Sequence, residues 1–171
     1  MMLVLTTLIF SFSASIAYAQ SGCSVSDPLD ALKAFKDGAG TFLLQKSTDP
    51  QARDCLKGTP NGNRDGNTLP VTMTYKDDSK WVSLNWMFTL EGANIVATLE
   101  GKRKQRGELV YDVQSHDCHI TKLSSGVYQQ WQSNGSADDK DIKCCDEKFK
   151  ELTSGIDYTK PQEKGCETSA K

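Results

Sequence analysis

The sequence is poor in the motifs on which catalysis and metal binding usually depend. It contains only two histidines, and it has neither a Gly-x-Ser-x-Gly nor a His-Glu-x-x-His motif. No Cys-x-x-Cys pair is present, and the histidines are not spaced for zinc, so we expect no metal and no other cofactor. His116-Asp117-Cys118-His119 is the one suggestive cluster, and a catalytic thiol there would require a free Cys118. We therefore expect that the protein is not an enzyme.

An excess of charge of one sign is also missing. Lys and Arg together number 20 against 22 for Asp and Glu. Without a basic stripe, nucleic acid is not an expected partner. Lys102-Arg103-Lys104-Gln105-Arg106 is the only basic cluster, and we interpret it as a solvated turn in preference to a site for a polyanion.

Long hydrophobic runs are confined to the start of the chain. The first 16 residues are apolar or small, and Ala17-Tyr18-Ala19 forms a small-x-small cleavage site before Gln20. This pattern predicts a signal peptide over 1–19, since the run is too short and too broken by Thr and Ser for a membrane anchor. We expect a secreted protein that makes no membrane contact, with a single domain of about 150 residues over 20–171.

The cysteines point to the same compartment. Six follow the signal peptide, and an even number in a secreted chain predicts three disulfides. The adjacent Cys144 and Cys145 rarely bond each other, so each should reach a distant partner. Six cysteines allow 15 pairings, and the spacing alone does not choose among them.

Two helices are expected at the ends of the domain. In the first, Leu29, Leu32 and Phe35 share one face after a cap at Ser26 or Asp27. The second should run from Cys144 to about Thr153 and should pack outside the sheet through Cys145, Phe149 and Leu152.

Short strands fill the region between these helices. We expect strands at 41–46, 52–57, 69–76, 80–90, 93–100, 107–114, 117–123 and 127–133. Alternation is clear in three of them, where the apolar residues are Val71, Met73 and Tyr75; Val82, Leu84, Trp86, Phe88 and Leu90; and Leu109, Tyr111 and Val113. Eight such strands predict an antiparallel sandwich or a closed barrel, and an eight-stranded barrel has room for one small ligand. If Cys118 bonds the outer helix, His119 and Asp117 point inward, for which a ligand is the natural reason.

Several segments together resemble a known family. They are Lys46 to Gly58, Asn67-Thr68-Leu69-Pro70-Val71, Val110-Tyr111-Asp112, Gln114-Ser115-His116 and the Cys144-Cys145 pair. The chain is similar to the moubatin clade of soft-tick salivary lipocalins, within the tick histamine-binding-protein-like family, although the Gly-x-Trp of ordinary lipocalins is absent. The resemblance implies an eight-stranded antiparallel lipocalin barrel with an N-terminal helix across its base and a C-terminal helix outside. It also implies disulfides between Cys23 and Cys144, Cys55 and Cys166, and Cys118 and Cys145.

The resemblance further implies a monomer that inhibits platelet aggregation by sequestering the eicosanoids thromboxane and leukotriene. Two alternatives stay open: an inhibitor that binds complement or a platelet receptor through its outer loops, and a scavenger of biogenic amines. Amine binders of the family carry Asp after the third cysteine and Glu-Leu before an aromatic residue of the last strand. Here those positions hold His119 and Gln129-Gln130, which favours an anionic lipid.

The family's ligand-contacting positions correspond to six residues of this chain: Phe35, Phe42, Arg53, Trp86, His119 and Trp131. The family places an arginine matching Arg53 at the ligand carboxylate. Alternation from an outward Cys55 would instead place Arg53 outside the barrel unless the strand bulges or ends there. A family arginine beside the ligand hydroxyls aligns near Arg106 or Gly107, and a family histidine is replaced by Asp117. Asn134-Gly135-Ser136 is a candidate glycosylation site.

Overall fold

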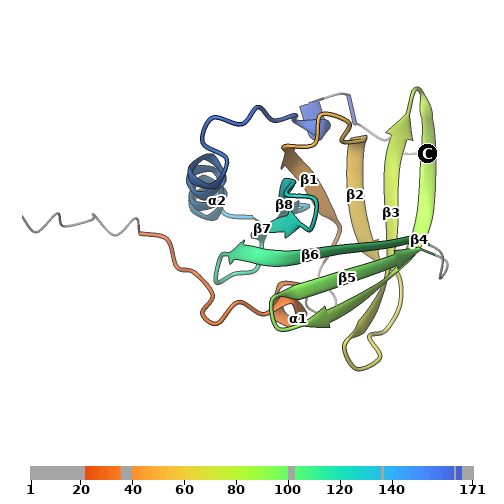
Figure 1. Cartoon of the computed structure of the whole chain (residues 1–171), viewed down its shortest axis with the longest axis horizontal. Coiled ribbons are helices and arrows are strands. Elements are labelled where there is room, and N and C mark those ends of the chain that lie inside the picture. The colour runs from red at the N-terminus through yellow and green to blue at the C-terminus, as the bar shows by residue number, and fades with distance from the viewer. Residues whose placement is uncertain (1–21, 36–39, 100–102, 136, 164, 167–171) are drawn as a thin grey trace, which may run out of the picture.

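The computed structural model of the chain is a closed eight-stranded antiparallel barrel with neighbours in chain order, β1 to β8, and β8 pairs back with β1 (Figure 1). The structure describes residues 22–35, 40–99, 103–135, 137–163 and 165–166, so the predicted signal peptide lies outside the described residues. The strands are β1 (Phe42–Ser47), β2 (Asp54–Pro60), β3 (Thr68–Asp77), β4 (Lys80–Glu91), β5 (Asn94–Leu99), β6 (Arg103–Asp112), β7 (Cys118–Leu123) and β8 (Tyr128–Ser133). The predicted barrel is confirmed.

A short helix, α1 (Ala31–Ala34), closes one end of the barrel. The Asp30 side chain caps it by accepting a hydrogen bond from the Leu32 amide at 2.9 Å, so the predicted cap at Ser26 or Asp27 is wrong. Ala31 and Ala34 are fully buried against the barrel core, because only small side chains let the helix backbone approach the strands this closely. The Arg64 guanidinium donates to the carbonyls of Leu32 and Phe35 and ties the helix to the β2–β3 loop.

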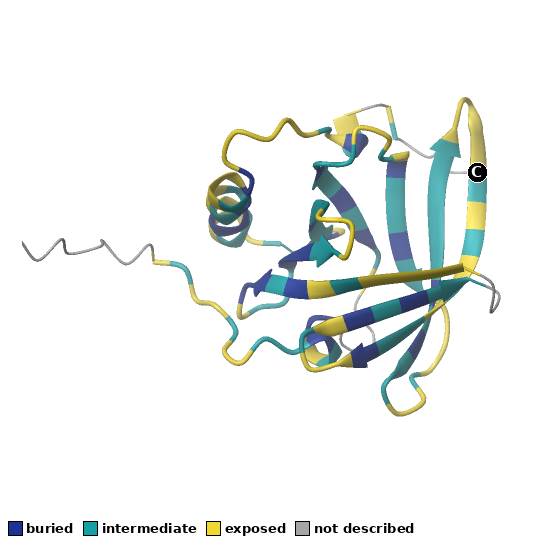
Figure 2. Cartoon of the chain, in the orientation of Figure 1, coloured by how far each residue is buried: buried dark blue, intermediate teal, exposed yellow. Residues whose placement is uncertain are grey.

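The opposite end is open, and we call it the mouth. It is surrounded by the β1–β2, β3–β4 and β7–β8 connections and by the first residues of β6. Figure 2 shows β6 exposed toward the mouth and buried toward its other end. Arg103 to Arg106 belong to this strand and not to the predicted turn. Exposure on both sides near the mouth leaves these residues without an apolar alternation, which explains why the strand was expected to begin only at Gly107.

A bulge in β6 separates two cores. The register shifts between Leu109 and Tyr111, so Leu109 joins the core inside the barrel while Tyr111 and Val113 join a second core outside it. The prediction that all three residues share one face is therefore wrong. A regular two-residue period cannot show where a bulge will insert an extra residue.

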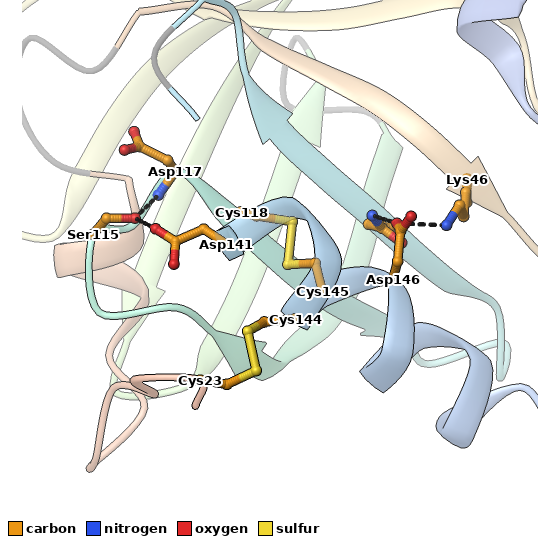
Figure 3. Close-up of a disulfide and its surroundings, with 10 residues drawn as sticks. Cys23, Lys46, Ser115, Asp117, Cys118, Asp141, Cys144, Cys145 and Asp146 are labelled. Atoms are coloured by element: carbon orange, nitrogen blue, oxygen red, sulfur yellow. Dashed lines mark hydrogen bonds and ion pairs between the residues drawn. A yellow bond between two sulfur atoms is a disulfide. The ribbon is translucent and has the colours of Figure 1, made fainter. Parts of the chain in front are cut away.

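Helix α2 (Asp139–Leu152) covers this outer core. It begins five residues before the predicted start, because Asp138 caps it and the acidic Asp139 and Asp141 favour the first turn without adding apolar periodicity. Two disulfides attach it, Cys23–Cys144 and Cys118–Cys145, as Figure 3 shows. Together with Cys55–Cys166 these are the pairs that the resemblance implies. The Asp146 carboxylate accepts from Lys46 at 2.5 Å and from Gln130 at 2.7 Å on the barrel wall.

A 3-10 turn, η1 (Pro161–Glu163), packs against β1 and β2. The described pairing between these two strands consists of Phe42 with Gly58 and Leu43 with Lys57. Beyond these pairs the Gln162 amide donates to the carbonyl of Leu44 at 3.3 Å and to that of Leu56 at 3.0 Å. The C-terminal segment thus completes the wall where the strands separate. No helix in the described part of the chain is long and apolar enough to cross a membrane.

Candidate functional site

The barrel contains a cavity that opens toward the mouth. The cavity itself measures about 110 Å³. All the empty space between its lining atoms, including the open solvent at the mouth, amounts to about 760 Å³. Most of its lining is apolar: Phe35, Phe42, Leu56, Gly58, Pro60, Val71, Met73, Phe88, Ile95, Ala97, Gly107, Leu123 and Trp131. Gln105, Thr121 and Gln129 add neutral polar groups, and Arg106 borders it. None of the described lining residues is a carboxylic acid.

Aromatic rings form the closed end of this cavity. The rings of Phe35 and Phe42 lie 5.7 Å apart, and the ring of His119 lies 4.9 Å from that of Phe35 and 5.2 Å from that of Phe42. Phe35 follows α1, Phe42 begins β1 and His119 lies on β7, so three separate elements meet here. Trp131 on β8 lines the cavity beside them. The structure therefore brings together four of the six residues expected from the resemblance.

His119 is fully buried, and neither ring nitrogen has a hydrogen-bond partner among the described residues. Burial lowers the pKa of His119 from 6.5 to about 3, with a smaller contribution from the nearby His116. The imidazole is therefore neutral at physiological pH and has one donor and one acceptor, but His119 is not among the cavity-lining residues. As a neutral group it can hydrogen-bond a hydroxyl or carbonyl, but it cannot neutralise an anion.

Trp86 lies on the inner face of β4, as alternation predicts. Its Cα partner is Val71, a cavity-lining residue, and directly opposed residues point to the same face. Trp86 itself is not among the cavity-lining residues and is only partly buried. It lies nearer the mouth than Phe88, which does line the cavity. A ligand would meet this ring only if it extended out of the cavity.

Arg53 lies at the rim of the mouth and not in the cavity. Its guanidinium forms an ion pair with Asp77 at 2.9 Å and lies over the ring of Tyr75, 5.4 Å from the centroid. Tyr75 continues the inner face of β3 that Val71 and Met73 begin, so the arginine lies above the inner wall. The bulge of β2 between Asp54 and Lys57 allows this placement. The Arg53 side chain is 56% exposed, so water can reach it freely.

A second arginine shares this rim and was not expected from the sequence. Arg103 is the Cα partner of Leu99, which in turn opposes Trp86, so Arg103 continues the same inner face. The position expected to supply an arginine inside the barrel is filled by Gly107, whereas alternation turns Arg106 outward. Arg53 and Arg103 therefore lie at the rim, and apart from the bordering Arg106 no described cavity-lining residue is a cation.

The sequence reasoning also missed a buried polar cluster beneath the cavity. Asp112 is fully buried and accepts hydrogen bonds from His116 at 2.5 Å and from the Ser26 hydroxyl at 2.9 Å. Asp112 opposes His119 across β6 and β7, so this cluster lies directly behind the cavity floor. Alternation does not reveal this cluster, because the contact between Asp112 and His116 lies beside the bulge of β6. The cluster anchors the N-terminal segment to the barrel.

Other candidate residues lie away from the cavity. Asn134 is exposed in the turn between β8 and α2, and Ser136 of its sequon lies outside the described residues. Asp117 lies in the β6–β7 turn, where its backbone amide donates a hydrogen bond to Ser115 Oγ at 3.2 Å. Among the described residues no group of three or more His, Cys, Asp or Glu side chains could hold a metal ion.

The comparisons with known proteins agree with the architecture. No protein-family model matches the chain. AM182, solved as a serotonin complex, has a TM-score of 0.67 and 21% identity over 85% of this chain and 97% of AM182. Lobster apocrustacyanin A1 and apocrustacyanin C2 both have TM-scores of 0.54 and 15% identity over 72% of this chain and 76% of theirs. At these identities the likeness shows the fold and not the ligand. The chain therefore has a lipocalin-like fold.

Proposed function

We propose that this protein is a secreted scavenger of eicosanoids, thromboxane and leukotriene among them, and that it inhibits platelet aggregation by holding them in its barrel. The observation that carries the proposal is an apolar, aromatic cavity without a carboxylic acid among its described lining residues. The three disulfides fit an extracellular protein. Membership of the moubatin clade is part of this proposal.

The apolar interior of the cavity and the cationic rim of the mouth together fit an amphipathic anion. An apolar tail can occupy the space between Phe42, Phe88 and Trp131, while a carboxylate remains at the mouth near Arg53 and Arg103. Each buried methylene contributes about 0.8 kcal/mol, whereas an exposed ion pair contributes about 0–1 kcal/mol. The tail therefore supplies most of the affinity, and the rim cations select the charge of the head group. His119 is not among the cavity-lining residues, so a hydrogen bond from it to a hydroxyl or carbonyl of the tail would require the rings of Phe35 and Phe42 to move.

A cationic amine fits this cavity poorly. Serotonin and histamine carry a positive charge at physiological pH, and burying it without a carboxylate partner costs several kcal/mol. The rim carboxylate Asp77 is already paired with Arg53. The serotonin in the AM182 complex thus shows what that protein holds and is not carried over to this chain.

Direct titration tests the proposal. A leukotriene, a stable thromboxane analogue, serotonin and histamine would each be titrated into the protein, with native mass spectrometry as the readout. We expect one eicosanoid per chain and no amine complex, and the inhibition of platelet aggregation should rise in proportion to protein until the mediator is exhausted. Tight serotonin or histamine binding, or inhibition far below one protein per mediator, would contradict it.

A further inference from the structure

The outer wall of the barrel carries a group of cations that the proposed function does not use. Lys104 and Arg106 lie on β6, and Lys122 lies on the neighbouring β7; we call these three residues the basic wall. Their neighbours Gln105 and Gly107 line the cavity, so alternation turns Lys104 and Arg106 to the outside. The segment that was expected to form a solvated turn is thus held on a rigid sheet.

The basic wall lacks acidic partners. No described Asp or Glu forms an ion pair with Lys104, Arg106 or Lys122. Lys46 and Arg53, by contrast, each pair with an aspartate. Glu108, which opposes Lys122, is the one acid on this face of β6. Cations left unpaired on a protein with a formal net charge of −2 concentrate positive potential on one face.

A groove runs beside these cations. It lies on the outer face where β6, β7 and the β7–β8 turn meet, and its lining includes Arg106, Lys122, Glu108, Asn94, Ser124 and Ser125. The Lys122 ammonium lies 5.4 Å from the centroid of the Tyr128 ring, which limits the positions it can take. The groove thus combines two cations and one carboxylate with hydroxyl and amide groups that can hydrogen-bond a polar ligand.

The neighbouring strand extends this polar surface. On β5, Thr98 opposes Lys104, and Val96 opposes Arg106. A lipid bilayer would favour large apolar side chains among the cations, yet the exposed Trp81 and Met87 belong to β4, beyond β5. Hydroxyls and cations side by side suit a chain of sulfated sugars better, since each sulfate accepts charge-assisted hydrogen bonds and each ring offers hydroxyls.

We infer that the basic wall and its groove bind a sulfated glycosaminoglycan, which would retain the protein on polysaccharide-coated surfaces while the mouth stays free. Lys104 and Lys122 do not line the cavity, whereas Arg106 and Gly107 border both the cavity and the groove. Polysaccharide binding through the two lysines can therefore be tested apart from lipid capture.

Heparin provides the probe. The triple variant Lys104→Ala/Arg106→Ala/Lys122→Ala is compared with Lys140→Ala/Lys143→Ala/Lys150→Ala, which removes the same charge from exposed positions of α2. Binding of a heparin oligosaccharide is measured by calorimetry between 50 and 200 mM salt. We expect the wall variant to bind at least about tenfold more weakly, with a salt slope lower by about 2 to 3, because each lost contact removes roughly 0.7–0.9. The α2 variant should retain wild-type affinity.

Three outcomes would overturn the inference: no heparin binding by the wild type at 50 mM salt, equal losses in the two variants, or equal binding of desulfated heparin. Tighter binding to phosphatidylserine vesicles than to heparin through the same residues would also overturn it, in favour of a membrane. An unchanged thermal transition in the wall variant shows that folding is intact. An unchanged eicosanoid stoichiometry is expected in Lys104→Ala/Lys122→Ala, which keeps the cavity-bordering Arg106. If the lipid proposal failed, the heparin result would still stand.

Discussion

His119 is a fully buried titratable residue, packed against the rings of Phe35 and Phe42. Its pKa of about 3 lies below the value of 6.5 expected in the unfolded chain. Between these values the unfolded state binds a proton that the folded state does not bind. His119 therefore makes the free energy of unfolding fall as the pH falls from 6.5 toward 3.

Replacing this histidine should remove that dependence. Between pH 6.5 and 5 the wild type should lose about 2 kcal/mol of stability more than His119→Phe, because each pH unit in this window is worth about 1.4 kcal/mol for one proton. Urea unfolding at pH 7, 6 and 5 gives the comparison. Other groups titrate equally in both proteins, so the difference between them isolates His119. Parallel curves for the two proteins would contradict the pKa assigned to this residue.

Arg53 presents the opposite case, a charge held in solvent at the rim. Arg53→Ala should weaken the binding of a fatty acid or leukotriene by at most about fivefold, since an exposed, screened ion pair contributes about 0–1 kcal/mol. Asp77→Asn frees the same guanidinium from its ion pair, so it should leave affinity unchanged or improve it. Fluorescence titration measures both, and the thermal transition of the empty protein should move little in either. Equal losses in the two variants would mean that the pair acts only as a structural tie.

At the scale of elements, η1 replaces part of a strand ladder. Gln162 supplies donors to the carbonyls of Leu44 and Leu56 where β1 and β2 no longer pair. Gln162→Ala should lower the free energy of unfolding by about 1–3 kcal/mol, because both carbonyls lose their donor in a poorly hydrated position. Gln51→Ala, at an exposed turn position, is the matched control and should have little effect. Urea unfolding decides between them, and equal effects would show that Gln162 does not hold the wall.

The elements also show which signals in the sequence were sufficient. β3 and β4 were predicted to within one residue at each end, since apolar residues alternate with polar ones along most of both sequences. β6 and α2 were predicted too short, because their first residues are charged and have no buried face. Phe35, Phe42 and Trp131 line the cavity, and their contact with a ligand stays a prediction, whereas the place of Arg53 depended on a bulge.

For the whole molecule, the Cys55–Cys166 disulfide closes a loop with a sequence separation of 111 and anchors the C-terminal segment to β2. Cys55→Ala/Cys166→Ala should cost roughly 2–5 kcal/mol of stability, as expected for a long loop. Cys23→Ala/Cys144→Ala, with a separation of 121, should cost about as much. Only Cys55→Ala/Cys166→Ala should also speed amide hydrogen exchange in β1 and β2 near Leu44 and Leu56, because only this disulfide holds the C-terminal segment against these strands. Equal exchange in both variants would contradict this local role.

The sequence by itself determined the number of disulfides, an antiparallel architecture of eight strands and the inward face of β4, whereas the closed barrel was expected only from the resemblance. The first three follow from the cysteine count and from two-residue alternation, which can be read without knowing which residues contact each other in the fold. Only the tertiary structure decided which residues face the cavity around the bulges in β2 and β6, why Arg53 lies at the rim, and how Asp112 meets His116 and Ser26. Bulges and buried polar contacts depend on residues far apart in the chain, and their energies arise only when the barrel closes around them.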